Sequence, residues 1–201
     1  MFLNDIGQPL ILDHRKTYGP YEQHDGPLIL TAAAFQDHVY PKNWCGQVFG
    51  SADDVARFQS TVADATQAYT YNVLTPNEPF QMEYKKIKNT LTLIPTDPNT
   101  RLYYLKNDYI RALWVDNLSG YLDFIPKAGT SFQRALSIGI DVIYIDDLCY
   151  MSDEDWTEAQ RENIYALVEL LRPKYLYGLR QDKLPKSLLD LCAQKGALEW
   201  D

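Results

Sequence analysis

The sequence predicts an α/β or α+β fold with a mixed sheet, antiparallel in its N-terminal and middle parts and ending in a βαβα unit. Residues 70–115 hold short runs rich in tyrosine, threonine and branched aliphatic residues, separated by the turn-like stretches PTDPNT and KND. Short turns between successive strands favour antiparallel pairing. Residues 131–195 instead alternate apolar strands with helical periodicity, which predicts parallel strands covered by helices.

The N-terminal part is expected to form short strands at PLILDH and GPLILTAAAF, with turns at Gly19-Pro20 and Gly26-Pro27. The first helix is predicted to begin at Ser51, whose hydroxyl can cap the free backbone amides. Asp53 and Asp54 suit the positive end of that helix dipole. Apolar residues that define its buried face recur at helical spacing, at Val55, Phe58, Val62, Ala65 and Tyr69.

The C-terminal third is predicted to alternate helices and strands. A short helix, SFQRALSI, stops at Gly139, and the strand DVIYID follows it. A long helix is expected from about Asp153 to Leu171, ended by Pro173, and the strand KYLYGL leads to a last helix near residues 185–195. No linker or low-complexity stretch interrupts the chain, so residues 1–201 are expected to form a single domain.

Negative charge is concentrated in one segment. The chain carries a formal net charge of -8, which disfavours nucleic acid as a partner because phosphate binding needs a basic face. Seven acidic residues and no lysine or arginine lie between positions 141 and 160. They are Asp141, Asp146, Asp147, Asp153, Glu154, Asp155 and Glu158.

The sequence carries no sign of a membrane or secreted protein. No apolar run approaches the roughly 20 residues that a membrane span needs. The N-terminus lacks a basic region and has Asn4 and Asp5 inside its apolar part, so it is a poor secretion signal. The three cysteines are odd in number and widely spaced, which is typical of reduced thiols. We therefore expect a cytoplasmic protein without a membrane partner.

One stretch raises the question of metal chemistry. YIDDL, with Asp146 and Asp147, resembles the Tyr-x-Asp-Asp metal-binding turn of reverse transcriptases, and Asp116 would be the third carboxylate. Only 30 residues separate Asp116 from Asp146, too few for the palm helices of that family, and the chain is acidic where a template would bind. A less specific hypothesis remains: carboxylates at a strand end, with Arg180 after the next strand, could hold a divalent metal and a phosphate ester.

Other catalytic patterns are weak. His14, His24 and His38 each adjoin an aspartate, but their spacing is not that of a zinc site. Cys45 is the best thiol candidate and lacks a local activating pattern. Neither a G-x-S-x-G elbow nor a glycine-rich phosphate loop occurs. The sequence therefore predicts no catalytic residue, no metal ligand and no cofactor, and it leaves enzymatic activity uncertain, leaning against it.

The leading hypothesis is a non-enzymatic protein-binding domain. An acidic chain without a catalytic constellation is similar in type to bacterial immunity proteins and antitoxins, which cover a basic partner through an acidic face. The alternative is a metal-dependent enzyme acting on a phosphate ester, and the second alternative is a scaffold or subunit, including a homodimer. The predicted partner-binding residues are Asp146, Asp147, Tyr150, Asp153, Glu154, Asp155, Trp156 and Glu158.

Overall fold

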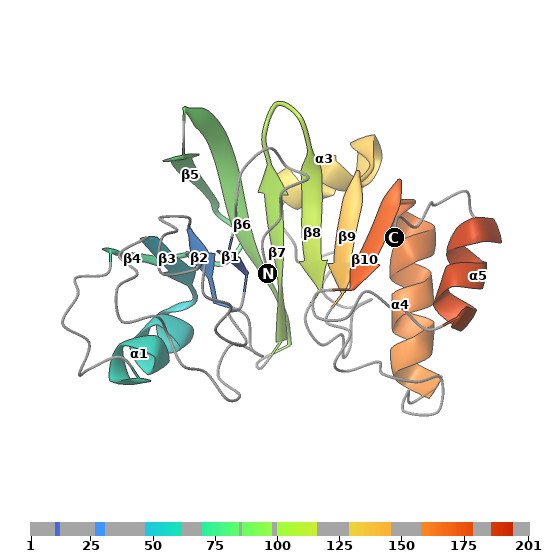
Figure 1. The fold of residues 1–201 in the computed structure, drawn as a ribbon, viewed down its shortest axis with the longest axis horizontal. Coiled ribbons are helices and arrows are strands. Elements are labelled where there is room, and N and C mark those ends of the chain that lie inside the picture. The colour runs from blue at the N-terminus through green and yellow to red at the C-terminus, as the bar shows by residue number, and fades with distance from the viewer. Residues whose placement is uncertain are drawn as a thin grey trace, which may run out of the picture.

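The computed structural model describes residues 11–12, 27–30, 47–61, 70–84, 86–97, 100–115, 129–145, 158–178 and 186–194. These residues form two β-sheets that pack against each other, with helices on the outer side of each sheet (Figure 1). The fold is thus α+β with mixed pairing and a majority of strands, which confirms the predicted fold class.

The first sheet has the strand order β1-β2-β3-β4 and is parallel throughout. Its strands are β1 (Ile11–Leu12), β2 (Leu28–Ile29), β3 (Gln47–Gly50) and β4 (Thr70–Val73). The prediction of antiparallel pairing in the N-terminal part is therefore wrong. Fifteen residues separate β1 from β2 and seventeen separate β2 from β3, long enough for the crossover that parallel neighbours need.

The second sheet has the order β10-β9-β8-β7-β6-β5. The strands β5 to β8 pair antiparallel, as predicted for the middle of the chain, and β8, β9 and β10 pair parallel, as predicted for its end. The six strands are β5 (Pro79–Tyr84), β6 (Ile87–Asp97), β7 (Thr100–Lys106), β8 (Arg111–Val115), β9 (Val142–Ile145) and β10 (Tyr175–Gly178).

Four described helices cover the two sheets: α1 (Ala52–Thr61), α3 (Thr130–Ile138), α4 (Glu158–Leu171) and α5 (Lys186–Gln194). Helix α1 begins as predicted, because the Ser51 Oγ accepts a hydrogen bond from the Asp54 amide at 3.2 Å. The expected start of α4 near Asp153 lies outside the described residues. None of the described helices is both long and apolar enough to cross a lipid bilayer.

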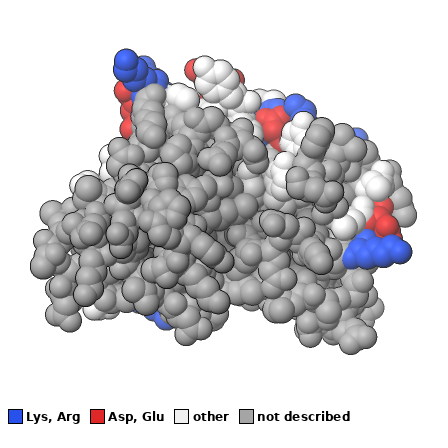
Figure 2. Space-filling model, in the orientation of Figure 1, with Lys and Arg blue, Asp and Glu red and all other residues white. Residues whose placement is uncertain are grey.

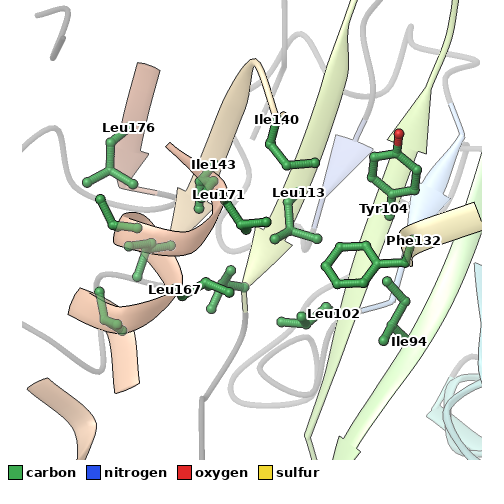
Figure 3. Close-up of a cluster of buried hydrophobic side chains, with 14 of the residues drawn as sticks. Ile94, Leu102, Tyr104, Leu113, Phe132, Ile140, Ile143, Leu167, Leu171 and Leu176 are labelled. Atoms are coloured by element: carbon green, nitrogen blue, oxygen red, sulfur yellow. The ribbon is translucent and has the colours of Figure 1, made fainter. Parts of the chain in front are cut away.

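The hydrophobic core has two layers, one on each face of the second sheet. One layer packs that sheet against α3, α4 and α5 and includes Phe132 of α3 and Leu167 of α4 (Figure 3). The other layer lies between the two sheets, where Phe49 of β3 belongs to one buried cluster with Trp114 and Tyr144 of the second sheet. The Tyr103 hydroxyl of β7 donates a hydrogen bond to the Leu30 carbonyl, which ties the sheets together directly.

Candidate functional site

The carboxyl ends of the three parallel strands of the second sheet lie side by side. Val115 of β8 lies opposite Ile145 of β9, which in turn lies opposite Gly178 of β10. The chain continues from β8 into Asp116 and from β9 into Asp146. Ligands of open α/β sheets bind beyond the carboxyl ends of parallel strands, so this edge is the candidate site.

Three stacked aromatic rings lie one residue before these strand ends. The Trp114 and Tyr144 ring centroids are 5.8 Å apart with planes 8° from parallel, and those of Tyr144 and Tyr177 are 5.5 Å apart at 20°. We call these three residues the aromatic ladder. Trp114 and Tyr144 are buried, and each stacked pair adds about 0.5–1.5 kcal/mol beyond the burial itself. The ladder therefore adds side-chain contacts to the backbone pairing of the three strand ends.

The indole of Trp114 also carries a polar atom that needs a partner. Its Nε1 is buried and has no hydrogen-bond acceptor among the described residues. A buried donor without an acceptor costs about 1–3 kcal/mol. Trp114 is two residues before Asp116 in sequence, so this donor lies beside the edge where the candidate ligands follow.

The opposite end of the same three strands is held by one carboxylate. Asp141, just before β9, accepts hydrogen bonds from the Arg111 Nε at 2.9 Å, the Arg111 Nη2 at 2.9 Å and the Arg111 backbone amide at 3.0 Å. The Lys174 Nζ lies 2.9 Å from the Oδ1 of Asp141. Arg111 begins β8 and Lys174 precedes β10, so Asp141 joins the amino ends of all three strands. We call these residues the Asp141 clamp.

The contacts within the clamp shift the pKa values of its residues. Burial of the Asp141 carboxylate raises its pKa, but hydrogen bonds from Arg111 and Lys174 outweigh this and lower the pKa to about 2. The hydrogen bond to Asp141 raises the pKa of Arg111 in turn. Asp141 is one of the seven acids of the acidic segment, but its charge is compensated within the fold by Arg111 and Lys174. This could not be predicted from neighbouring residues, because both partners are about thirty residues away in sequence.

Most of the predicted partner-binding residues fall outside the described part of the chain. Glu158 is the first residue of α4, and nothing further is described for its side chain. The acidic face therefore stays a prediction. The residues outside the described ranges are Asp146, Asp147, Tyr150, Asp153, Glu154, Asp155 and Trp156.

The weaker catalytic candidates also lie outside the described part of the chain. The three histidines and Cys45 lie outside the described residues, as does Arg180. Within the ranges that the structure describes, no three histidine, cysteine, aspartate or glutamate residues come close enough to hold a metal ion.

The fold is similar to that of known proteins, although the sequence is not. No protein-family model matches the chain, and no curated protein matches it significantly. Among solved structures, it is similar to the metallo-β-lactamase fold protein YhfI from Bacillus subtilis. The TM-score is 0.53 at 12% identity, over 92% of this chain and 76% of YhfI. It is also similar to a mutant of CmlA β-hydroxylase, with a TM-score of 0.52 at 10% identity, over 86% of this chain but only 42% of CmlA.

This likeness corrects the leading hypothesis from the sequence. The chain has a metallo-β-lactamase-like fold, and the solved structures that it resembles are not immunity proteins or antitoxins, so the prediction of an immunity or antitoxin protein is wrong. That prediction relied on overall acidity and on the absence of catalytic motifs, and neither property is specific to a fold.

Proposed function

We propose that the chain is a metal-dependent enzyme that acts on a phosphate ester at the carboxyl edge of β8, β9 and β10. One observation carries the proposal: β8 and β9 are parallel neighbours in register, and the sequence continues from them into Asp116 and into Asp146-Asp147. Neighbouring strands are about 4.8 Å apart, a spacing at which carboxylates from two strands can share one ion.

The chemistry of these donors favours a particular kind of metal. Carboxylate oxygens are the ligands that Mg²⁺ and Mn²⁺ prefer, whereas zinc sites usually include histidine or cysteine. We assign the ligand role to Asp116, Asp146 and Asp147. When bound, a divalent ion supplies Lewis-acid stabilisation of a phosphoryl group and lowers the pKa of bound water.

The described residues contribute by positioning these ligands. The aromatic ladder fixes the strand ends on one side, and the Asp141 clamp fixes the strand starts on the other. Arg180 is the second residue after β10 and would offer a cation to the phosphate group. The likeness to a protein of the metallo-β-lactamase fold supports a metal-dependent chemistry.

The proposal is tested by metal-dependent stability. An ion present at about 100 times its Kd stabilises the native state by about 2.7 kcal/mol, which raises the Tm of a chain of this size by roughly 5–10 °C. We expect this rise for the native chain in Mg²⁺ or Mn²⁺, and not for the double variant Asp146→Asn with Asp147→Asn. The exposed Asp108→Asn variant removes one carboxylate outside the proposed site and is the control.

A second measurement tests the reaction itself. With Mn²⁺, the native chain and the Asp108→Asn control should hydrolyse bis(p-nitrophenyl) phosphate, and the double variant should lose this activity. Equal metal stabilisation of the native chain and the double variant would show that the ion binds elsewhere, and the proposed site would then be abandoned.

A further inference from the structure

The end of the second sheet away from the candidate site carries exposed lysines and exposed apolar side chains. The β5–β6 turn brings Lys86 and Lys88 to this end, and Lys106 ends β7 just before the β7–β8 turn. Tyr109, in that second turn, is 78% exposed, and Ile138, at the end of α3, is 58% exposed. These five residues and Lys174 form what we call the basic rim.

Hydrogen bonds and strand register show that the basic rim is continuous. The Asn107 side-chain amide donates to the Asn89 Oδ1 at 3.1 Å, which connects the β7–β8 turn to β6 near Lys88. The Arg111 Nη1 donates to the Ile138 carbonyl at 3.1 Å, which connects the start of β8 to the end of α3.

The Asp141 clamp adds Lys174 to the same end through its contact with the carboxylate. Figure 2 shows charged side chains along the upper rim of the molecule, over the turns that Figure 1 places there.

The charge at this end is opposite to that of the chain. The described residues here include five cations and three carboxylates, a net charge of +2, whereas the whole chain carries -8. The cations are Lys86, Lys88, Lys106, Arg111 and Lys174, and the carboxylates are Glu83, Asp108 and Asp141. Arg111 and Lys174 both contact Asp141, although the Lys174 side chain remains 67% exposed. The cations that chiefly face solvent are therefore the exposed Lys86, Lys88 and Lys106.

We propose that the basic rim binds the surface of a membrane that contains anionic phospholipids. The two apolar residues project from a turn and from a helix end. A protein partner would need a complementary surface of about 800 Å², whereas a lipid surface accepts isolated projecting side chains. Tyrosine rings favour the headgroup level of a bilayer, and lysines near them are attracted to anionic headgroups. The negative charge on the rest of the chain is screened beyond about 8 Å at physiological ionic strength.

This proposal concerns adsorption to a surface, not insertion. The sequence led us to expect no membrane partner because no segment could span a bilayer. Surface binding needs no spanning segment, only projecting apolar side chains and nearby lysines. It is also independent of the proposed metal site, since the basic rim lies at the amino ends of β8, β9 and β10.

The test is co-sedimentation of the full chain with phosphatidylcholine vesicles, with and without phosphatidylserine, in metal-free buffer. Each lysine near an anionic surface contributes about fivefold in affinity. We therefore expect binding to the anionic vesicles alone, and a loss on the order of 100-fold when Lys86, Lys88 and Lys106 are all changed to Gln. The Tyr109→Ser variant should also bind more weakly, although its charge is unchanged.

Matched controls separate this effect from general charge and from folding. Lys106→Gln and Arg57→Gln remove the same charge, but Arg57 is an exposed residue of α1, which lies at the other end of the molecule from the basic rim (Figure 1). We expect about a fivefold loss for the first and none for the second, with both Tm values near that of the native chain. Equal binding to neutral and anionic vesicles, no binding to either, or equal losses in both single variants would overturn the proposal.

Discussion

The Asp141 clamp permits a quantitative prediction for Asp141→Asn. The substitution keeps the size of the side chain and removes its charge, so the paired Arg111 hydrogen bonds at 2.9 Å lose their ionic partner. The pKa of Asp141 falls from its ordinary 3.8 to about 2, which corresponds to about 2 kcal/mol of stability at neutral pH. We expect urea unfolding at pH 7 to show the variant less stable by about 2 kcal/mol.

The same clamp predicts how this difference depends on pH. The folded-state pKa of Asp141 lies below its unfolded value, so the carboxylate stabilises the fold fully only above pH 4. That stabilisation is lost as the pH falls from about 4 towards 2, because the carboxylate then becomes protonated in both states. The difference in free energy of unfolding between the native chain and the Asp141→Asn variant should therefore disappear over this range.

Unfolding curves of both proteins between pH 7 and pH 2 measure this gap. The exposed Asp108→Asn variant is the control and should show a difference of less than about 0.5 kcal/mol at every pH. A gap between the native chain and Asp141→Asn that is the same at pH 7 and at pH 2 would refute the argument, since the clamp would then act without its charge.

Two further substitutions test contacts that join parts of the fold. Tyr103→Phe removes the hydrogen bond to the Leu30 carbonyl between the sheets and should cost about 1–3 kcal/mol in urea unfolding, whereas the same change at the exposed Tyr109 should cost almost nothing. Gly129→Ala would place a Cβ atom 2.5 Å from the Asn77 carbonyl oxygen, so it should lower the stability by about 1–3 kcal/mol and the Tm measurably; an unchanged Tm would show that the backbone yields there.

The helices and the middle strands could be predicted from local sequence. Ser51 begins α1 as a cap, and the structure shows its hydroxyl bonded to the Asp54 amide. The stop of α3 at Gly139 was predicted from the glycine, whose φ of 92° favours a residue without a side chain. The antiparallel pairs β6–β7 and β7–β8 followed from the turn-like stretches PTDPNT and KND, because a short turn favours that pairing. Strand β5 was not predicted, and its antiparallel pairing with β6 is known only from the structure.

The pairing of the first sheet could not be predicted in the same way. Its strands are two to four residues long and lie far apart in sequence, so neither periodicity nor turn length constrained their direction. The stretch around Thr70–Val73 was grouped with the antiparallel middle part, but it pairs parallel with β3.

The candidate site was only partly accessible from the sequence. Asp146 and Asp147 were recognised as strand-end carboxylates, which is a local property of the sequence. That β8 is the parallel neighbour of β9, and that Asp116 follows it at the same edge, depends on strand order. The Asp141 clamp was missed for a related reason: its partners lie beside two other strands, and the sequence placed Asp141 only among the seven acids of residues 141–160.

The position of the Asp141 clamp determines where the protein can tolerate substitutions without losing stability. Asp141 immediately precedes β9 and Ile145 ends it, so the two are four residues and about 13 Å apart. Free-energy effects of substitutions at sites more than about 10 Å apart usually add independently. The Asp141 clamp can therefore preserve the stability of the sheet while the residues beyond the strand ends are substituted. The same sheet could then carry a different set of metal-binding residues without any change in the clamp.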